Sequence, residues 1–136
     1  RSFGPGRAAL YAGNDYENKA NETILTLAMI ESHNALDNLD GILKVKGLDA
    51  VFVGPSDLAL SLGYSAGDHE EPVLMDAIET ILRKTKSNGK RAGIYTLTPK
   101  YAKQMIKLGF DYVVISSDAR MLSVQANKTL IDILSK

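Results

Sequence analysis

Four short apolar segments, separated by segments of helical periodicity, constrain the fold of this chain more than any other feature. They are Ile24–Ile30, Ala50–Val53, Ala92–Tyr95 and Tyr112–Ile115. Each is too short for a typical helix and almost continuously apolar, as expected of strands buried on both faces of a parallel sheet. We therefore expect four strand–helix units, preceded by an opening loop over Arg1–Asn21 that is rich in glycine.

The intervening segments carry helix signals of their own. The expected helices are Asn34–Leu43, Glu71–Asn88, Pro99–Leu108 and a last helix capped by Asp118. Thr98 is a typical N-cap before a proline at the first helical position, and Gly109 is a typical stop. The second helix is predicted to bury one apolar stripe, because its apolar residues recur at intervals of three and four. These residues are Val73, Leu74, Ala77, Ile78, Ile81 and Leu82.

Strict alternation of strand and helix predicts an α/β fold with parallel strands joined by crossover helices. Four such units are half of the eight that close a TIM (β/α)8 barrel. A small open α/β sheet is the alternative. The 136 residues contain no internal linker or repeat, so we expect residues 1–136 to form a single domain.

Composition excludes several classes of function. The 16 basic and 16 acidic residues balance, which gives no support for binding to nucleic acid or to an acidic membrane surface. The chain has no cysteine, so it has neither disulfides nor thiolate metal sites, and a cytoplasmic location is expected. Because the sequence does not begin with methionine, we also expect it to start partway through a longer protein.

Two carboxylates follow neighbouring predicted strands. Glu31 follows the first strand, and Asp57 follows the second across Gly54-Pro55-Ser56. Functional residues of parallel α/β folds gather beyond the carboxyl ends of the strands, which lie about 4.8 Å apart. Glu31 and Asp57 can therefore share a hard cation such as Mg²⁺ or Mn²⁺. The alternative is that both acids only cap the helices that follow.

Other polar residues are weaker candidates. A short helix starting near Asp57 would favour an anionic group, for instance a substrate carboxylate. Tyr95, at the end of the third strand, either lines a pocket or packs in the core. His33 and His69 are predicted to have no functional role. A basic cluster is expected to be a solvated helix end; it consists of Lys84, Lys86, Lys90 and Arg91. A second set, in the opening loop, could close over an anion; it consists of Arg1, Ser2 and Arg7.

Two stretches together resemble a known enzyme family. They are "RSFGPGRAALYAGNDYENKANETILTLAMIES" and "LDAVFVGPSDLALSLG". The spacing of Met29-Ile30-Glu31 relative to Gly54-Pro55-Ser56-Asp57 is similar to that of the HpcH/HpaI-type class II pyruvate aldolases. These enzymes include the 4-hydroxy-2-oxoheptanedioate and 2-dehydro-3-deoxyglucarate aldolases. The resemblance covers the whole chain and implies the C-terminal half, strands five to eight, of a (β/α) barrel.

The resemblance implies a role for individual residues. Glu31 and Asp57 match the metal ligands, with Mg²⁺, Mn²⁺ or Co²⁺ as the implied ion. Gly54, Pro55 and Ser56 match the turn that holds the carboxylate of pyruvate. Met29 falls where some members carry a glutamine that contacts the substrate, and Tyr95 matches a position lining the pocket. The implied reaction is reversible cleavage of a 4-hydroxy-2-oxo acid to pyruvate and an aldehyde.

The same resemblance implies that part of the machinery lies elsewhere. The family takes its catalytic histidine base and an arginine from the N-terminal half of the barrel, so no catalytic residue is expected in this chain. A homo-oligomer, often a hexamer, is the implied assembly. Two alternatives remain open: a non-catalytic half barrel that associates with itself, and an enzyme similar to the citrate lyase β type.

Overall fold

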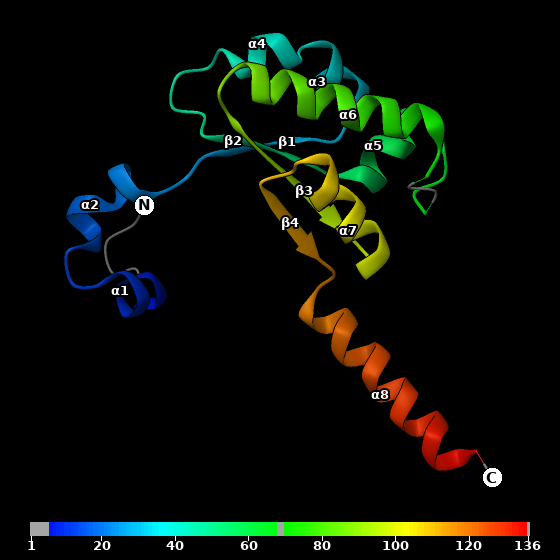
Figure 1. Cartoon of the computed structure of the whole chain (residues 1–136). Helices are drawn as coiled ribbons and strands as arrows, with labels where there is room; N and C mark the ends of the chain where they lie inside the picture. The colour runs from blue at the N-terminus through cyan, green and yellow to red at the C-terminus, as the bar shows by residue number, and fades with distance from the viewer. Residues whose placement is uncertain (1–5, 68–69, 136) are drawn as a thin grey trace.

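The computed structural model describes residues 6–67 and 70–135, which contain one four-stranded parallel sheet. Its strands are β1 (Leu27–Ile30), β2 (Ala50–Val53), β3 (Arg91–Thr96) and β4 (Tyr112–Ile115). They lie side by side in chain order, β1-β2-β3-β4 (Figure 1). All neighbouring pairs are parallel, so all four carboxyl ends meet at one edge, which confirms the predicted alternation of strand and helix.

Helices connect the strands. The described helices are α1 (Gly6–Ala12), α2 (Tyr16–Thr23), α3 (His33–Asp37), α4 (Leu39–Leu43), α5 (Pro55–Ser61), α6 (Pro72–Ser87), α7 (Pro99–Leu108) and α8 (Asp118–Leu134). Helix α6 packs against β2 and β3, and α7 packs against β3 and β4. The core lies between these helices and the sheet, where Val51, Ile78 and Ile94 are completely buried.

The other face of the sheet is much less covered. Successive residues of a strand alternate between faces, and the register places Met29, Phe52, Gly93 and Tyr112 side by side in one row across the four strands. Met29 is 50% exposed and Tyr112 is 57% exposed. This row faces the side that, in a closed barrel, would be the interior.

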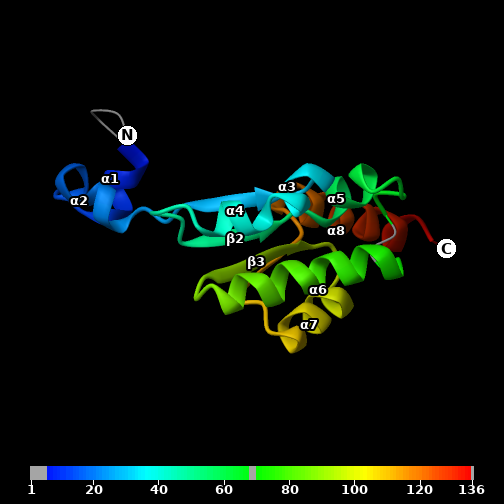
Figure 2. The ribbon, with the colours of Figure 1, turned by 90° about the horizontal axis from the view of Figure 1, so that it is seen from above.

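The opening segment differs from the expected loop over residues 1–21. Its described part forms α1 and α2, which lie beyond the amino end of β1 and apart from the sheet (Figures 1 and 2). Ala20 is the only buried residue of α2, so this helix has no apolar stripe to reveal it in the sequence. The first strand begins at Leu27 rather than Ile24, because Ile24 is the C-cap of α2.

The predicted helix over Asn34–Leu43 is two short helices. Asn38 divides them, since its side-chain amide donates a hydrogen bond of 2.8 Å to the Asn34 carbonyl and its backbone leaves the helical range. Asparagine side chains compete with helical hydrogen bonds in this way. Leu39 and Leu43 are still buried as predicted.

The long helix α6 follows the predicted pattern with one exception. Five of its six predicted apolar positions are buried, but Val73 is 46% exposed because it lies in the first turn, beside the start of the helix. Asn88 is the C-cap, as the Asn-Gly signal predicts. Helix α7 has the predicted bounds, and Thr98 caps it by accepting a hydrogen bond of 3.2 Å from the Tyr101 N–H.

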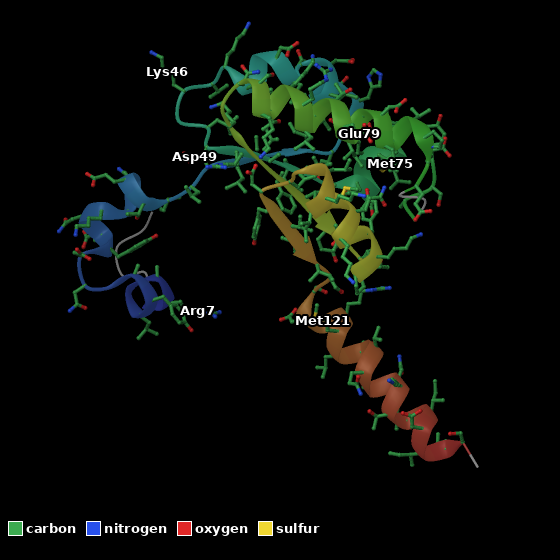
Figure 3. All side chains as sticks on the ribbon, viewed as in Figure 1. Arg7, Lys46, Asp49, Met75, Glu79 and Met121 are labelled. Atoms are coloured by element: carbon green, nitrogen blue, oxygen red, sulfur yellow. The ribbon has the colours of Figure 1, made fainter. Side chains whose placement is uncertain are left out.

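The last helix extends away from the sheet (Figure 1). Its N-cap is Ser117, which accepts from the Arg120 N–H, whereas the predicted cap Asp118 lies in the first turn. None of its residues is buried, and Figure 3 shows the far part of the helix standing clear of the rest of the chain. Met121, near its start, lines a cavity together with Leu97 and Pro99. Within residues 6–67 and 70–135, no helix is long and apolar enough to cross a membrane.

Candidate active site at the carboxyl edge of the sheet

A cavity of about 230 Å³ opens at the carboxyl ends of the first three strands. Asp57 and Phe52 contribute to its lining together with every residue that the sequence predicts to bind substrate. The complete lining is Met29, Phe52, Gly54, Pro55, Ser56, Asp57 and Tyr95. The structure thus brings residues from three neighbouring strands around one cavity. The first and last of them, Met29 and Tyr95, are 66 positions apart in the chain.

Glu31 lies directly beside Gly54. A β-carbon built on Gly54 would come within 3.0 Å of the Glu31 Oε2 atom and 3.1 Å of its Cβ. A side chain at position 54 would therefore displace the Glu31 carboxylate. The Gly54 N–H donates a hydrogen bond of 3.2 Å to the Ile30 carbonyl, which ties the end of β2 to the end of β1. The ends of β1 and β2 therefore place the Glu31 carboxylate next to Gly54, the residue that precedes α5.

Helix α5 begins immediately after β2. Gly54 is its N-cap and Pro55 its first residue, a position where proline is favoured because no N–H is needed there. Asp57 lies in the first turn and is exposed, next to the partial positive charge of the helix terminus. The short helix predicted near Asp57 is therefore present, and its first turn lines the cavity.

The alternative role of the two acids, helix capping, is not fulfilled by Glu31. The N-cap of α3 is Ser32, whose hydroxyl accepts a hydrogen bond of 3.2 Å from the Ala35 N–H. Asp57 follows the N-cap of its own helix by three residues. In the part of the chain that the structure describes, neither Glu31 nor Asp57 forms an ion pair with a basic side chain.

The described residues do not by themselves surround a metal ion with side chains. Among the described residues, no three histidine, aspartate or glutamate side chains gather into a possible metal site. The described residues supply two candidate metal ligands, the carboxylates of Glu31 and Asp57 at neighbouring strand ends. Their oxygen chemistry suits a hard divalent cation that keeps its remaining positions for water and substrate oxygens.

The two histidines and the opening residues lie apart from the cavity or outside the description. His33 pairs with Asp37 one turn along α3, at 3.0 Å, as expected of a surface side chain. His69, Arg1 and Ser2 fall outside the described residues. Arg7 is exposed on α1.

The basic cluster lies at the end of α6 and the start of β3 and is partly solvated, as predicted: the side chains of Lys86 and Arg91 are 39% and 78% exposed. Each of its members binds an acceptor near the amino edge of the sheet, opposite to the cavity. The contacts are Lys84 with Asp40 at 2.8 Å, Lys86 and Arg91 with Asp111 at 2.5 and 3.0 Å, and Lys90 with the Leu48 carbonyl at 2.5 Å. Burial raises the pKa of Asp111, but hydrogen bonds from Lys86, the Ala92 N–H and Arg91 outweigh it and lower the pKa to about 2.

Phe52 is the cavity residue that sequence reasoning missed. It stands in the middle of the apolar run Ala50–Val53, where nothing marks it as different from its buried neighbours. The strand alternation offers a signal, because Val51 and Val53 face the helices and Phe52 must then face the other side. Its ring meets that of Tyr112, with centroids 6.1 Å apart.

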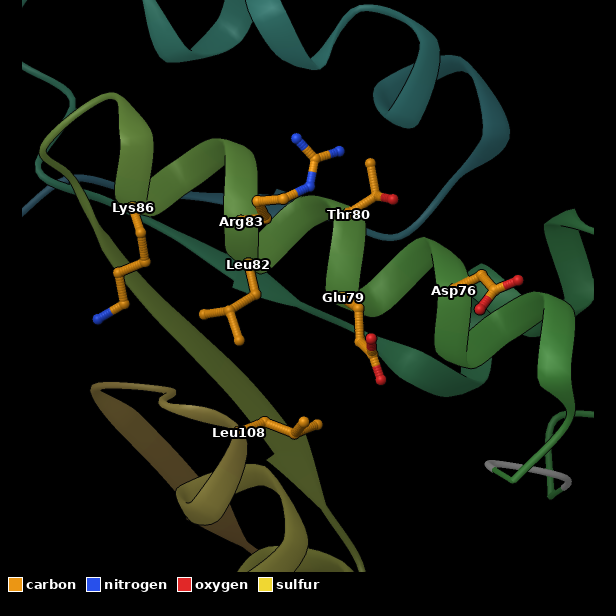
Figure 4. A pocket seen from close by; sticks show the side chains of 7 residues that line it. All are labelled: Asp76, Glu79, Thr80, Leu82, Arg83, Lys86 and Leu108. Carbon is orange, nitrogen blue, oxygen red and sulfur yellow. The ribbon is translucent and has the colours of Figure 1, made fainter.

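A larger cavity, of about 620 Å³, lies elsewhere, on the outer side of α6 facing α7 (Figure 4). It is lined by Asp76, Glu79, Thr80, Leu82, Arg83, Lys86 and Leu108. Its two acidic residues come first along α6 and its two basic residues follow, and Lys86 is paired with Asp111. None of the predicted site residues reaches it, so the smaller cavity at the strand ends is the better candidate despite its size.

Solved structures place the fold in a known class. The chain superposes with a TM-score of 0.82 and 30% identity on an HpcH/HpaI aldolase/citrate lyase family protein from Burkholderia cenocepacia, covering 99% of this chain and 52% of that one. An HpcH/HpaI aldolase from Desulfitobacterium hafniense gives a TM-score of 0.80 at 28% identity, with coverages of 90% and 47%. The sheet and its strand-end cavity are thus half of a TIM (β/α)8 barrel.

Sequence comparisons give the particular family. The family model described as HpcH/HpaI aldolase/citrate lyase matches residues 6–124, and the chain belongs to this family. It is 43% identical over 133 residues to a hydroxypyruvate/pyruvate aldolase of Rhizorhabdus wittichii, covering 97% of this chain and 53% of that protein. It is 40% identical over 111 residues to a 2-keto-3-deoxy-L-rhamnonate aldolase of Escherichia coli, with coverages of 80% and 40%. The chain therefore spans about half the length, or less, of these relatives.

Proposed function

We propose that this chain is the C-terminal half of a metal-dependent pyruvate aldolase, which cleaves a 4-hydroxy-2-oxo acid to pyruvate and an aldehyde. One observation carries the proposal: the strand-end cavity gathers Gly54, Ser56 and Asp57 beside the carboxylate of Glu31 in a chain of this family. The similarity to relatives named aldolases favours this reaction over that of a citrate lyase β-type enzyme, which would bind a coenzyme A thioester.

Glu31 and Asp57 would hold the divalent cation, with Mg²⁺, Mn²⁺ or Co²⁺ as candidates. The residues fit such an ion in two respects. Their carboxylates are oxygen ligands at neighbouring strand ends without competing basic partners in the described chain, and Gly54 leaves the space that the Glu31 carboxylate occupies. When bound, the ion would stabilise negative charge on the carbonyl oxygen of the 2-oxo acid.

The turn at the start of α5 would hold the carboxylate of pyruvate. Gly54, Pro55 and Ser56 line the cavity, and the positive end of a helix favours an anion there. Met29 and Tyr95 would form the apolar walls from β1 and β3. Anchoring the carboxylate orients the reacting carbon atoms, which lowers the entropic part of the barrier.

The proton transfers would fall to the other half of the barrel. His33 faces Asp37 on the surface of α3, so it is not available to act in the cavity. We propose that a histidine base and an arginine come from the N-terminal half, and that the complete enzyme is a cytoplasmic homo-oligomer. The composition without cysteine favours the cytoplasm.

The test is an assay of pyruvate release by the complete protein, coupled to lactate dehydrogenase. Turnover of a 4-hydroxy-2-oxo acid should stop with a chelator and return with Mg²⁺ or Mn²⁺. Glu31→Gln and Asp57→Asn should each lower kcat/KM by about 100-fold or more, since the ion supplies several kcal/mol to the transition state.

Matched variants control for loss of charge alone. Glu79→Gln and Asp76→Asn make the same changes on the outer side of α6, and both should leave kcat/KM within about twofold, as expected away from the site. Turnover that is insensitive to chelation, or equal losses from the α6 variants, would contradict the proposed metal site.

A second candidate is a non-catalytic half barrel that associates with itself. The observation that favours it is the apolar surface of α8, where Leu122, Ile131 and Leu134 are each at least 66% exposed. Large exposed apolar surfaces promote association. Sedimentation velocity on the 136-residue chain tests this candidate: it requires dimers or larger species, and a folded monomer at all concentrations would rule it out.

A further inference from the structure

Gly93 stands at the centre of the row that crosses the uncovered face of the sheet. The register places it between Phe52 on β2 and Tyr112 on β4. Its backbone is not in the left-handed region, in contrast to five other glycines of the chain, so the conformation of the strand does not require a glycine. A glycine inside a strand weakens it, and often marks a place where another group approaches closely.

The group that approaches is the ring of Phe52. A β-carbon on Gly93 would lie 2.6 Å from the Phe52 Cδ2 atom and 3.2 Å from its Cε2 atom. It would also lie 3.4 Å from the Cδ1 atom of Tyr112. The rings of Phe52 and Tyr112 therefore meet over the space that a side chain at position 93 would occupy, with an angle of 53° between their planes.

This arrangement bears on the strand-end cavity. Phe52 and Met29 are neighbours in the row and both line the cavity, whereas Gly93 does not. Because Gly93 has no side chain, the Phe52 ring can lie over β3. A methyl group at position 93 would push the ring back toward β1, into the space between Phe52 and Met29.

We propose that Gly93 is a positioning residue: it lets the Phe52 ring lie over β3 and so sets the size of the 2-oxo acid that the cavity admits. The inference rests on the proposed aldolase function and concerns the donor substrate of that same site. Gly93 itself touches no substrate. Its effect on the reaction is transmitted by the position of the Phe52 ring.

The experiment measures exchange of the C3 hydrogens of a 2-oxo acid with deuterium, by NMR, in the complete protein with Mg²⁺. This reaction needs no aldehyde, so it reports on the donor alone. Pyruvate is compared with 2-oxobutanoate, which is one carbon longer. In Gly93→Ala, the ratio of kcat/KM for 2-oxobutanoate to that for pyruvate should fall by about fivefold or more, as expected of overpacking at this contact.

Two further variants identify the cause. Phe52→Ala should raise the same ratio, and in the Phe52→Ala background the change Gly93→Ala should no longer lower it. The matched control is Gly41→Ala, because a β-carbon there meets nothing within 4 Å, and the ratio should stay unchanged. An equal loss for both donors in Gly93→Ala, or the same selective loss without the Phe52 ring, would overturn the inference.

The design covers two other outcomes. If Gly93→Ala alone fails to fold, the double variant decides: a folded protein with the donor ratio of Phe52→Ala supports the inference, and an unfolded one contradicts it. If the unaltered protein shows no metal-dependent exchange with pyruvate, the proposed function fails. A crystal structure of Gly93→Ala then still tests the packing, since an unmoved Phe52 ring would refute the positioning role by itself.

Discussion

At the scale of single residues, Asp111 stands out because its carboxylate binds donors from two elements, α6 and β3. It accepts hydrogen bonds from Lys86 on α6 and from Arg91 and the Ala92 N–H on β3, and only 19% of its side chain is exposed. We expect Asp111→Asn to lower the free energy of unfolding by about 1–2 kcal/mol at pH 7, as for a partly exposed group bonded to charged donors. Urea unfolding measures this loss.

The same residue predicts a pH dependence. Its pKa is lowered from an ordinary 3.8 to about 2 in the folded protein. The stabilisation is therefore complete above pH 4 and is lost as the pH falls toward 2. The difference in unfolding free energy between the unaltered protein and Asp111→Asn should shrink over this interval. Asp132→Asn, on the exposed helix α8, is the control, and a constant difference down to pH 2.5 would contradict the assignment.

Glu31 and Lys86 show how far single residues could be predicted from the sequence. Glu31 lies just after the carboxyl end of β1, as predicted, because the end of a strand can be located from its local apolar pattern. The structure also separates it from the capping role, which Ser32 takes. The pairing of Lys86 was not predicted, since its partner Asp111 comes 25 residues later and no local pattern reveals a pairing across that distance.

At the scale of elements, the N-cap of α7 allows the contribution of one hydrogen bond to the stability of the fold to be measured. The Thr98 hydroxyl accepts from the Tyr101 N–H, and Pro99 and Gly109 fix the two ends of the helix. We expect Thr98→Ala to cost about 1 kcal/mol of unfolding free energy, the usual effect of losing an N-cap. Thr98→Ser keeps the acceptor and should cost less than half as much. Equal losses in urea unfolding would show that the hydroxyl is not responsible.

The helices that could be predicted are those with strong local signals. Helix α7 has the predicted bounds because proline and glycine dictate the backbone at its ends. The break at Asn38 was missed, since an asparagine inside an apolar pattern is usually tolerated and its competing hydrogen bond to Asn34 is visible only in the structure. Helix α2 buries only Ala20, so periodicity could not reveal it.

At the scale of the whole molecule, the sheet ends at β1 and β4, which have one hydrogen-bonded neighbour each, whereas β2 and β3 have two. Backbone N–H groups of β2 and β3 should therefore exchange with deuterium more slowly than those of β1 and β4 in the isolated chain. Adding the N-terminal half of the barrel should slow the edge strands toward the rate of the central ones. Mass spectrometry resolves the four segments, and edges that already exchange as slowly as the centre would contradict an open half barrel.

The order of the strands has a consequence for how such barrels can be recombined. Every strand–strand boundary within the chain joins neighbours in sequence. Two hydrogen bonds at the amino edge of the sheet are also internal: Asp49, labelled in Figure 3, accepts from the Thr26 N–H, and Lys90 donates to the Leu48 carbonyl. Exchanging this segment between related barrels would create new contacts at two seams only. Hybrids built by cutting before β1 should inherit the proposed cation- and carboxylate-binding corner from one parent, while the proposed proton-transferring groups would come from the other.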